Sequence, residues 1–149
     1  DLVPGPDEDL SFLCGDWRIF QRRRGHRWSL DDLLTAALAL EEAADHGAVR
    51  RALDMGCGIG SVLMMVAWGL PDATLLGVEA QALSHGLAQR SLAYNGAADR
   101  CEVRLGDLRD PSLVPAGAFD LVTGTPPYLA PGSGPESARD QRGPCWIAK

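Results

Sequence analysis

The sequence predicts an α/β domain with a mostly parallel sheet and helices on both faces. Segments typical of buried strands alternate with segments typical of helices through most of the chain. Residues 74–79 hold a continuous Leu-Leu-Gly-Val run, as in sheets covered on both faces. A glycine-rich stretch at residues 54–60, Asp-Met-Gly-Cys-Gly-Ile-Gly, joins another such strand directly to a helix. Right-handed crossovers would bring the carboxyl ends of these strands to one edge of a parallel sheet.

The first residues predict a leader and a hairpin ahead of the main sheet. Residues 1–9 are rich in proline and acid, which favours a flexible leader followed by a single domain over residues 10–149. Residues 17–28 carry aromatic and aliphatic side chains interrupted by Arg-Gly-His, which predicts a short hairpin turning near Gly25. We expect this hairpin to cover one end of the main sheet.

The next segment predicts a helix that ends before Gly47. Ser29 or Asp31 can cap its first turn, because a short polar side chain there can accept a hydrogen bond from a free helical amide. Apolar residues recur within it at helical spacing and predict a stripe that packs on the sheet. This stripe would consist of Leu33, Leu34, Ala37 and Leu38.

The central segments give the alternation of strands and helices. We expect strands at residues 50–55, 74–79, 101–105 and 119–123, and helices at residues 61–69 and 82–95. Because the first of these helices is apolar almost all round, its residues 62–68 should be well buried. Asn95-Gly96 predicts the end of the second helix.

Composition limits the classes of function. The net charge of −6 and pI of about 4.9 oppose general adhesion to nucleic acid. Residues 17–28 nevertheless contain no acid and include Arg22, Arg23, Arg24 and Arg27, which could contact phosphates. The alternative is that this basic cluster is only a solvated surface.

The sequence shows neither a membrane segment nor a metal-binding pattern. No apolar run reaches the roughly 18 residues that a membrane helix requires, and the first ten residues do not resemble a signal peptide. The four cysteines are scattered, with no CxxC pair and no histidine at a ligand spacing. We therefore expect a cytoplasmic protein without a membrane contact or a metal.

The glycine-rich stretch predicts a nucleotide-type cofactor. Closely spaced glycines allow a ligand to approach the main chain, and the amides of the following helix would face it. Glu79 follows Gly60 by about the twenty residues expected of a carboxylate that binds ribose hydroxyls. The dinucleotide fingerprint would place its third glycine where Ser61 stands, which weakens the nicotinamide interpretation. A tight turn that only permits close helix packing is the structural alternative.

Two further segments follow predicted strands at the same edge of the sheet. Asp107 could accept a hydrogen bond from an adenine amine, although it could equally be an ordinary turn residue. Gly-Thr-Pro-Pro-Tyr-Leu at residues 124–129 predicts a rigid loop with free acceptors, because proline has no amide hydrogen. Such a loop suits a planar substrate with an NH2 group, with Tyr128 stacking on its plane. A proline-rich surface turn is the alternative.

These motifs resemble those of class I S-adenosylmethionine-dependent methyltransferases, in the methyltransferase small domain family and closest to its bacterial tRNA N6-adenine methyltransferases. The resemblance covers about residues 20–148 and includes Arg27-Trp-Ser-Leu-Asp31-Asp-Leu-Leu, residues 54–60, Gly77-Val-Glu79, Gly106-Asp-Leu-Arg109 and Pro126-Pro-Tyr128. It implies a Rossmann-like fold and S-adenosylmethionine as cofactor. In that family Asp54 would lie near the methionine end of the cofactor.

The resemblance and the residue patterns together assign the site. The cofactor would contact Asp54, Gly56, Cys57, Gly58, Gly60, Glu79, Ala80, Asp107 and Leu108. The catalytic loop would be Thr125, Pro126, Pro127 and Tyr128, and RNA would contact Arg22, Arg23, Arg24 and Arg27.

Two departures from the family pattern affect the expected function. The family loop begins with Asn or Asp, whose side chain binds the target amine, and this chain has Thr125 there. The family also continues through further strands, so we expect a domain that lacks its C-terminal strands and an exposed edge at residues 119–123 that could bind a partner or a second copy.

Three functions remain open on the sequence. The leading hypothesis is methylation of the exocyclic amine of an adenine in RNA, with tRNA as the substrate. The same loop serves enzymes that methylate a protein glutamine amide. The third possibility is a cofactor-binding module without catalysis, in which Thr125 has replaced the amine-binding residue.

Overall fold

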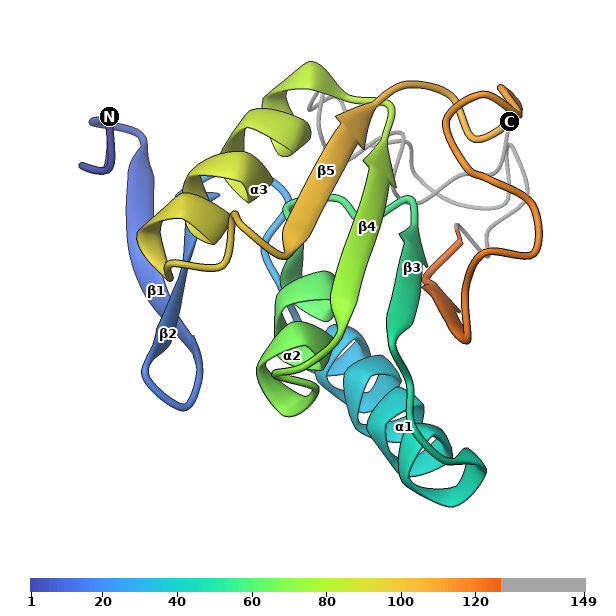
Figure 1. The fold of residues 1–149 in the computed structure, drawn as a ribbon. Coiled ribbons are helices and arrows are strands. Elements are labelled where there is room, and N and C mark those ends of the chain that lie inside the picture. The colour runs from blue at the N-terminus through green and yellow to red at the C-terminus, as the bar shows by residue number, and fades with distance from the viewer. Residues whose placement is uncertain (127–149) are drawn as a thin grey trace, which may run out of the picture.

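The computed structural model describes residues 1–126. Its elements, in chain order, are β1 (Glu8–Cys14), β2 (Trp17–Arg22), α1 (Leu30–His46), β3 (Arg51–Met55), α2 (Ser61–Gly69), β4 (Thr74–Glu79), α3 (Ala82–Tyr94), β5 (Cys101–Leu105) and β6 (Leu121–Gly124) (Figure 1). From β3 onward these bounds lie within two residues of the predicted ones.

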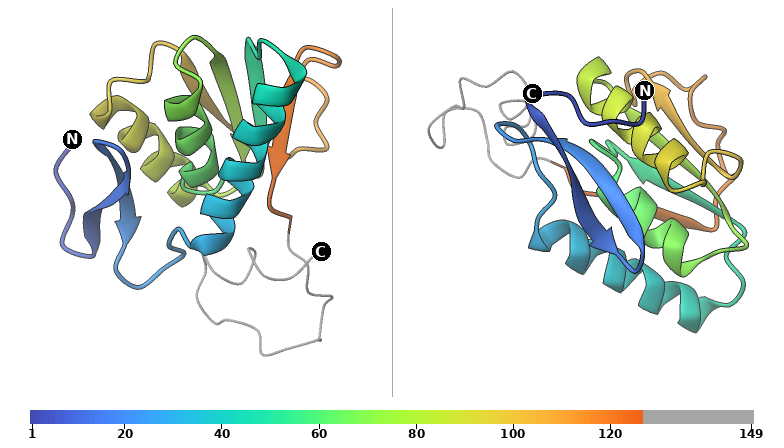
Figure 2. Two further views of the ribbon diagram at one scale, coloured as in Figure 1. Left: turned by 90° about the horizontal axis from the view of Figure 1, so that it is seen from below. Right: turned by 90° about the vertical axis from the view of Figure 1, so that its left-hand side faces the viewer.

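The main sheet is parallel and has the strand order β5-β4-β3-β6. Figure 2 shows α1, α2 and α3 side by side on one face of this sheet, with the β1–β2 hairpin beside them. The α/β class and the parallel sheet that the sequence predicts are confirmed. All four strands place their carboxyl ends at one edge, which brings residues far apart in the chain together.

The opposite face of the sheet is covered differently from the prediction of helices on both faces. Among residues 1–126, no helix lies on that face. Instead, Leu53, Leu76 and Val78 project from the strands and pack against apolar side chains of the connection between β5 and β6. Those side chains are Leu113, Val114 and Phe119. An irregular connection thus supplies the second apolar layer.

Helix α1 packs through its alanines, so the predicted leucine stripe is wrong. Ala36, Ala39 and Ala43 are buried, whereas Leu33, Leu34 and Leu38 are exposed. The small side chains allow α1 to approach α2 closely: a methyl group added at Gly69 of α2 would lie 2.6 Å from the Leu40 side chain. The start of the helix is a capping box formed by Ser29 and Asp32.

Helix α2 is buried along most of its length, as its composition predicts, with the exception of Trp68. Residues 61–67 are all buried. Trp68, expected to be buried, is 48% exposed. It lies against the turn of the hairpin, where a Cβ atom at Gly15 would come within 2.6 Å of the indole nitrogen. Trp68 therefore covers the contact between α2 and the hairpin on its solvent side.

The hairpin occurs earlier in the chain than predicted. Its strands are β1 and β2, and the turn between them contains Gly15 with φ +52° rather than Gly25. Strand β1 was missed because its first residues, Glu8 and Asp9, belong to the acidic segment that resembles a leader. Arg90 of α3 also donates hydrogen bonds to the carbonyls of Asp1 and Val3. The division of the chain at residue 9 remains a prediction.

Two further observations concern the surface. None of the described helices is long and apolar enough to cross a membrane. Within residues 1–126, β6 is hydrogen-bonded on one side only, to β3, and Val122 is half exposed. This edge fits the predicted exposed strand, while the association of another chain with it remains a prediction.

Candidate active site

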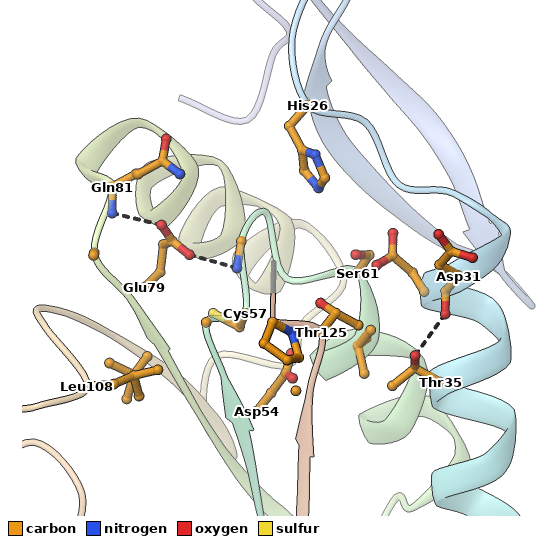
Figure 3. A pocket seen from close by; sticks show the side chains of 18 of the residues that line it. His26, Asp31, Thr35, Asp54, Cys57, Ser61, Glu79, Gln81, Leu108 and Thr125 are labelled. Atoms are coloured by element: carbon orange, nitrogen blue, oxygen red, sulfur yellow. Dashed lines mark hydrogen bonds between the residues drawn. The ribbon is translucent and has the colours of Figure 1, made fainter. Parts of the chain in front are cut away.

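A cavity of about 900 Å³ opens at the carboxyl ends of the parallel strands. Figure 3 shows its wall, to which β3, β4, α1, α2 and the segments after β4, β5 and β6 all contribute. Residues predicted from four separate motifs meet there: Asp54, Glu79, Asp107 and Thr125 all line the cavity. The convergence predicted from the parallel topology is therefore present in the structure.

The glycine-rich loop lines the floor of this cavity. Gly56 and Gly58 have φ of +67° and +56°, and no atom lies within 4 Å of a Cβ built on either of them. Their backbones are therefore open to a ligand, in a conformation that favours glycine. Cys57 also lines the cavity, and its amide donates to the Val78 carbonyl over 3.0 Å. Burial raises the pKa of its thiol well above the usual value.

Gly60 has a different role from the other two glycines of this loop. It does not line the cavity but caps the amino end of α2 with φ of +85°. A Cβ there would lie 3.2 Å from the Ala88 side chain of α3. The third glycine thus permits close packing of α2 and α3, as the structural alternative for the loop supposed.

Glu79, at the end of β4, anchors the loop. Its Oε2 accepts a hydrogen bond from the Gly58 amide over 2.9 Å, and its Oε1 accepts one from the Gln81 amide over 2.7 Å. The residue is only 6% exposed. A carboxylate can accept about four hydrogen bonds, so each oxygen keeps a position for a ligand hydroxyl. Ala80 also lines this side of the cavity.

Asp54 is buried at the base of the cavity. Its Oδ1 accepts a hydrogen bond from the Thr123 hydroxyl over 2.8 Å. Its Oδ2 is buried and has no hydrogen-bond partner among the described residues. Burial raises the pKa of this carboxyl to about 7, which the Thr123 hydroxyl and the Leu63 backbone oppose. A buried charged acceptor without a partner is costly, which agrees with the raised pKa of this carboxyl.

Asp107 and Leu108 line the cavity on the side of β5. The Asp107 carboxylate accepts hydrogen bonds from the backbone and the guanidinium of Arg109. The Arg109 side-chain hydrogen bond lowers the pKa of Asp107 to about 2. Asp107 is therefore ionised, but both of its oxygens accept hydrogen bonds from Arg109, and its role with an adenine amine stays a prediction.

Thr125 and Pro126 line the cavity directly after β6. Figure 3 labels Thr125 and Asp54 among the side chains that line the cavity. The other two members of the predicted catalytic loop, Pro127 and Tyr128, lie outside the described residues.

The predicted basic cluster is largely paired with acids. Arg22 forms an ion pair with Asp7, and Arg27 forms one with Asp9, each over 2.7 Å. Arg23 donates to the carbonyl of Glu8. These partners come from β1 and the residue before it, so the neighbouring strand neutralises Arg22 and Arg27 but not Arg23 and Arg24. Arg27 lines the cavity, whereas the other three arginines do not.

Apart from Arg27, the wall formed by α1 and the segment before it was not predicted as part of the site. It comprises His26, Ser29, Asp31, Asp32 and Thr35, and α2 adds Ser61 (Figure 3). Asp32 is buried and accepts the Ser29 amide over 2.9 Å. The two adjacent acids after a capping serine were a usable signal, because they mark a helix amino end with excess acceptors. Among residues 1–126, no cluster of three or more His, Cys, Asp or Glu side chains could hold a metal ion.

The residues of the cavity fit an adenosine-containing cofactor with a positively charged end. One side of the cavity has the open backbones of Gly56 and Gly58. The Glu79 carboxylate, with its spare acceptor positions, and Leu108 lie on the same side. The acidic groups Asp31, Asp32 and Asp54 lie toward α1, and one oxygen of Asp54 lacks a donor. This distribution matches a ribose at one end and a cation at the other.

Comparison with known proteins agrees with this geometry. The family model "Methyltransferase small domain" matches residues 28–138. The tRNA1(Val) (adenine(37)-N6)-methyltransferase of Porphyromonas gingivalis is 32% identical over 128 residues, covering 83% of this chain and 49% of that protein. The ribosomal protein uL3 glutamine methyltransferase of Bordetella pertussis is 31% identical over 116 residues, covering 71% of this chain and 38% of that protein. This chain thus spans half or less of the length of these relatives.

A solved structure supports the same fold. The tRNA (uracil-54, C5)-methyltransferase of Pyrococcus abyssi, crystallised with S-adenosyl-L-homocysteine, superposes with a TM-score of 0.58 at 17% identity, covering 79% of this chain and 28% of that one. At this identity the likeness concerns the fold. Since the family model matches more than half of the residues, the chain belongs to the methyltransferase small domain family, which uses S-adenosylmethionine, as its motifs predict.

Proposed function

We propose that this protein transfers a methyl group from S-adenosylmethionine to the exocyclic amine of an adenine in RNA, with tRNA as the substrate. The observation that carries the proposal is the shared cavity, in which the glycine-rich loop and Glu79 lie opposite the start of the Thr-Pro-Pro-Tyr loop. The tRNA adenine methyltransferase among the relatives supports the choice of substrate. We also propose that the reaction takes place in the cytoplasm, where tRNA is modified.

The cofactor half of the cavity would work through hydrogen bonds and charge. Glu79 would accept the ribose hydroxyls, and the Gly56 and Gly58 backbones would allow close approach. Asp107 would accept the adenine amine, and Asp54 would face the methionine end. When bound, S-adenosylmethionine supplies a methyl group on a positively charged sulfur.

The substrate half would work by positioning. The Thr125 carbonyl and the Thr125 hydroxyl are two acceptors at the start of this loop. These oxygens would accept the hydrogens of a planar NH2 group and direct its nitrogen toward the methyl group. Orientation of this kind lowers the barrier without a strong general base.

Replacing Thr125 with Asn is expected to raise the rate of methyl transfer by about tenfold to a hundredfold. An amide side chain reaches further than a hydroxyl and aligns the target amine with a better placed acceptor, and each 1.4 kcal/mol gained in the transition state is tenfold in rate. The measurement is transfer of a labelled methyl group to unmodified tRNA. Thr125→Val, which has the shape of threonine without its hydroxyl, is the matched control and should lower the rate. An inactive wild-type chain that Thr125→Asn does not activate would favour a binding module without catalysis.

A protein glutamine amide is the second candidate substrate. An amide NH2 resembles the adenine NH2 in plane and donors, and the glutamine methyltransferase among the relatives matches this chain almost as well as the tRNA enzyme does. Labelled methyl transfer to unmodified tRNA and to a glutamine-containing peptide, measured side by side, separates the two. Transfer to the peptide alone would replace the RNA proposal.

Removing the exposed arginines of the hairpin is expected to weaken RNA binding. Arg23 and Arg24 are exposed, whereas Arg22 and Arg27 are paired with acids. Losing two phosphate contacts should lower affinity by about three- to tenfold and reduce the slope of binding against salt concentration by roughly one to two. Filter binding of tRNA by the Arg23→Ala, Arg24→Ala double variant measures both quantities. The control is Arg50→Ala with Arg51→Ala, which removes equal charge at the opposite edge of the sheet; equal losses in both variants would contradict a specific contact.

A further inference from the structure

His26 is the only aromatic side chain among the described residues that line the cavity. It belongs to the segment of residues 23–29 between β2 and α1, which we call the strap. Figure 3 shows the His26 ring pointing from the strap into the cavity. The groups assigned to the ribose and the adenine of the cofactor lie instead at the carboxyl ends of β3, β4 and β5. His26 therefore reaches the cavity from an element that these groups do not use.

The strap is anchored on both sides of His26. Before it, the Arg23 amide donates to a carbonyl of the segment ahead of β1 over 2.9 Å. After it, Arg27 forms its ion pair with Asp9, and Trp28 packs against the main hydrophobic core. Because these contacts belong to the fold, they place the His26 ring at the cavity in advance. Placement of this kind lowers the cost of ordering a side chain when a substrate binds.

An aromatic ring in this cavity suits an RNA base. A base that is modified in RNA leaves its stack and is held in the active site between aromatic or apolar side chains. Stacking on an aromatic side chain is favourable for any base, since every base has a flat π face. A glutamine amide has no such ring and would gain little from His26. The ring thus favours an adenine over an amide as the substrate.

The strap also places His26 close to the exposed arginines. Arg23 and Arg24 are exposed and precede His26 by three and two residues, so at most about 11 Å of chain separates them from it. The phosphates of a nucleotide could contact these arginines outside the cavity while its base enters. One short segment can therefore bind both parts of the target nucleotide.

We propose that His26 is a substrate-binding residue whose ring stacks on the target adenine and holds this base in the cavity with Thr125. The inference rests on the proposed function, because it takes an adenine of RNA to be the substrate. It assigns the base-binding role to the strap, in addition to the loop after β6. It also names the side chain that separates an adenine from a glutamine amide.

The first test is a binding measurement that needs no catalysis. Protein saturated with S-adenosyl-L-homocysteine is titrated with adenosine 5′-monophosphate at constant pH, and the ring-proton NMR signals of the three histidines are followed. His26→Ala identifies the His26 signals by their loss. A stacked base should move these signals upfield, while those of His46, at the far end of α1, stay in place. Ribose 5-phosphate, which has no base, is the control ligand and should move neither. An unchanged His26 signal would contradict the proposal.

The second test is the rate of methyl transfer to unmodified tRNA. His26→Ala should lower kcat/KM for tRNA by about fivefold to 150-fold, the range expected for one lost stacking contact, and leave the affinity for S-adenosylmethionine unchanged. His26→Phe keeps a flat ring and should retain most of the wild-type rate. His26→Asn keeps a polar side chain without an aromatic ring and should behave like His26→Ala. Thermal unfolding shows whether each variant is folded.

The outcomes separate this inference from the proposed function. If His26→Asn retains the rate and His26→Phe loses it, the ring acts through its nitrogens and stacking is wrong. If His26→Ala weakens binding of S-adenosylmethionine as much as it lowers the rate with tRNA, His26 belongs to the cofactor half. The proposed function stands in both cases. If wild-type protein methylates only the glutamine-containing peptide, or binds no S-adenosylmethionine, the proposed function fails and this inference fails with it.

Discussion

Gly58→Ala is expected to raise the dissociation constant for S-adenosylmethionine by about tenfold to a hundredfold. Gly58 lines the cavity with φ of +56°, and the space that a Cβ would occupy is open. A methyl group there would hold the ligand away from the loop and displace contacts worth about 1.4 to 2.8 kcal/mol, at 1.4 kcal/mol for each factor of ten. Isothermal titration gives the value directly.

The matched control for this variant is Gly117→Ala. Gly117 has φ of +65°, also has no atom within 4 Å of a built Cβ, and does not line the cavity. Both substitutions place a side chain in the left-handed region, at a cost of about 1 to 2 kcal/mol in stability. Both should therefore lower the unfolding temperature by similar amounts, while only Gly58→Ala weakens binding. Equal affinities in the two variants would mean that the ligand does not approach the glycine-rich loop.

Glu79→Ala is expected to have the largest effect, with binding weakened about a hundredfold or more and the apo protein destabilised. Two backbone amides, of Gly58 and Gln81, would lose their acceptor, at about 1 to 3 kcal/mol for each that water does not reach. The loop would also lose its anchor, and the ribose its carboxylate. Titration measures the affinity, and denaturant unfolding without ligand measures the stability.

Glu102→Ala is the control for Glu79→Ala. Glu102 is also a strand glutamate, but its side chain is mostly exposed and pairs only with Arg104 on the same strand. An exposed pair of this kind contributes little to stability. This variant should bind S-adenosylmethionine like the wild-type chain. If Glu79→Ala loses stability but retains affinity once folded, Glu79 is only a structural anchor of the loop.

The sequence predicts those site residues whose placement depends only on their position within a strand. Asp54, Glu79 and Thr125 each lie at a strand's carboxyl end or one residue from it, and parallel topology alone is enough to bring such ends together. To predict which residues of α1 contribute to the site, one must know how that helix is rotated about its axis. That rotation is decided by Ala36 and Ala39 fitting against a neighbour rather than by the larger hydrophobicity of the leucines.

Contacts between strands were beyond prediction for a related reason. Asp54 and Thr123 are 69 residues apart, and only the register between β3 and β6 places them opposite each other. The same applies to the basic cluster, because the register that pairs Glu8 with Arg22 also brings Asp7 beside Arg22. Residues 17–28 considered alone therefore overstate the free positive charge, because Arg22 and Arg27 are paired with acids from outside that segment.

The docking of the β1–β2 hairpin has a consequence for how the chain folds during synthesis. The hairpin can form its own ladder early, but its partners are on α3: Ser91 accepts the Phe20 amide and Asn95 accepts the Arg18 amide, at separations of 71 and 77 residues. At about 5 to 20 residues per second, ribosomes deliver those partners roughly 4 to 15 seconds later. Ile19 and Phe20, fully buried in the finished fold, stay uncovered during that interval. The hairpin thus exposes two large apolar side chains on the nascent chain until α3 has been made.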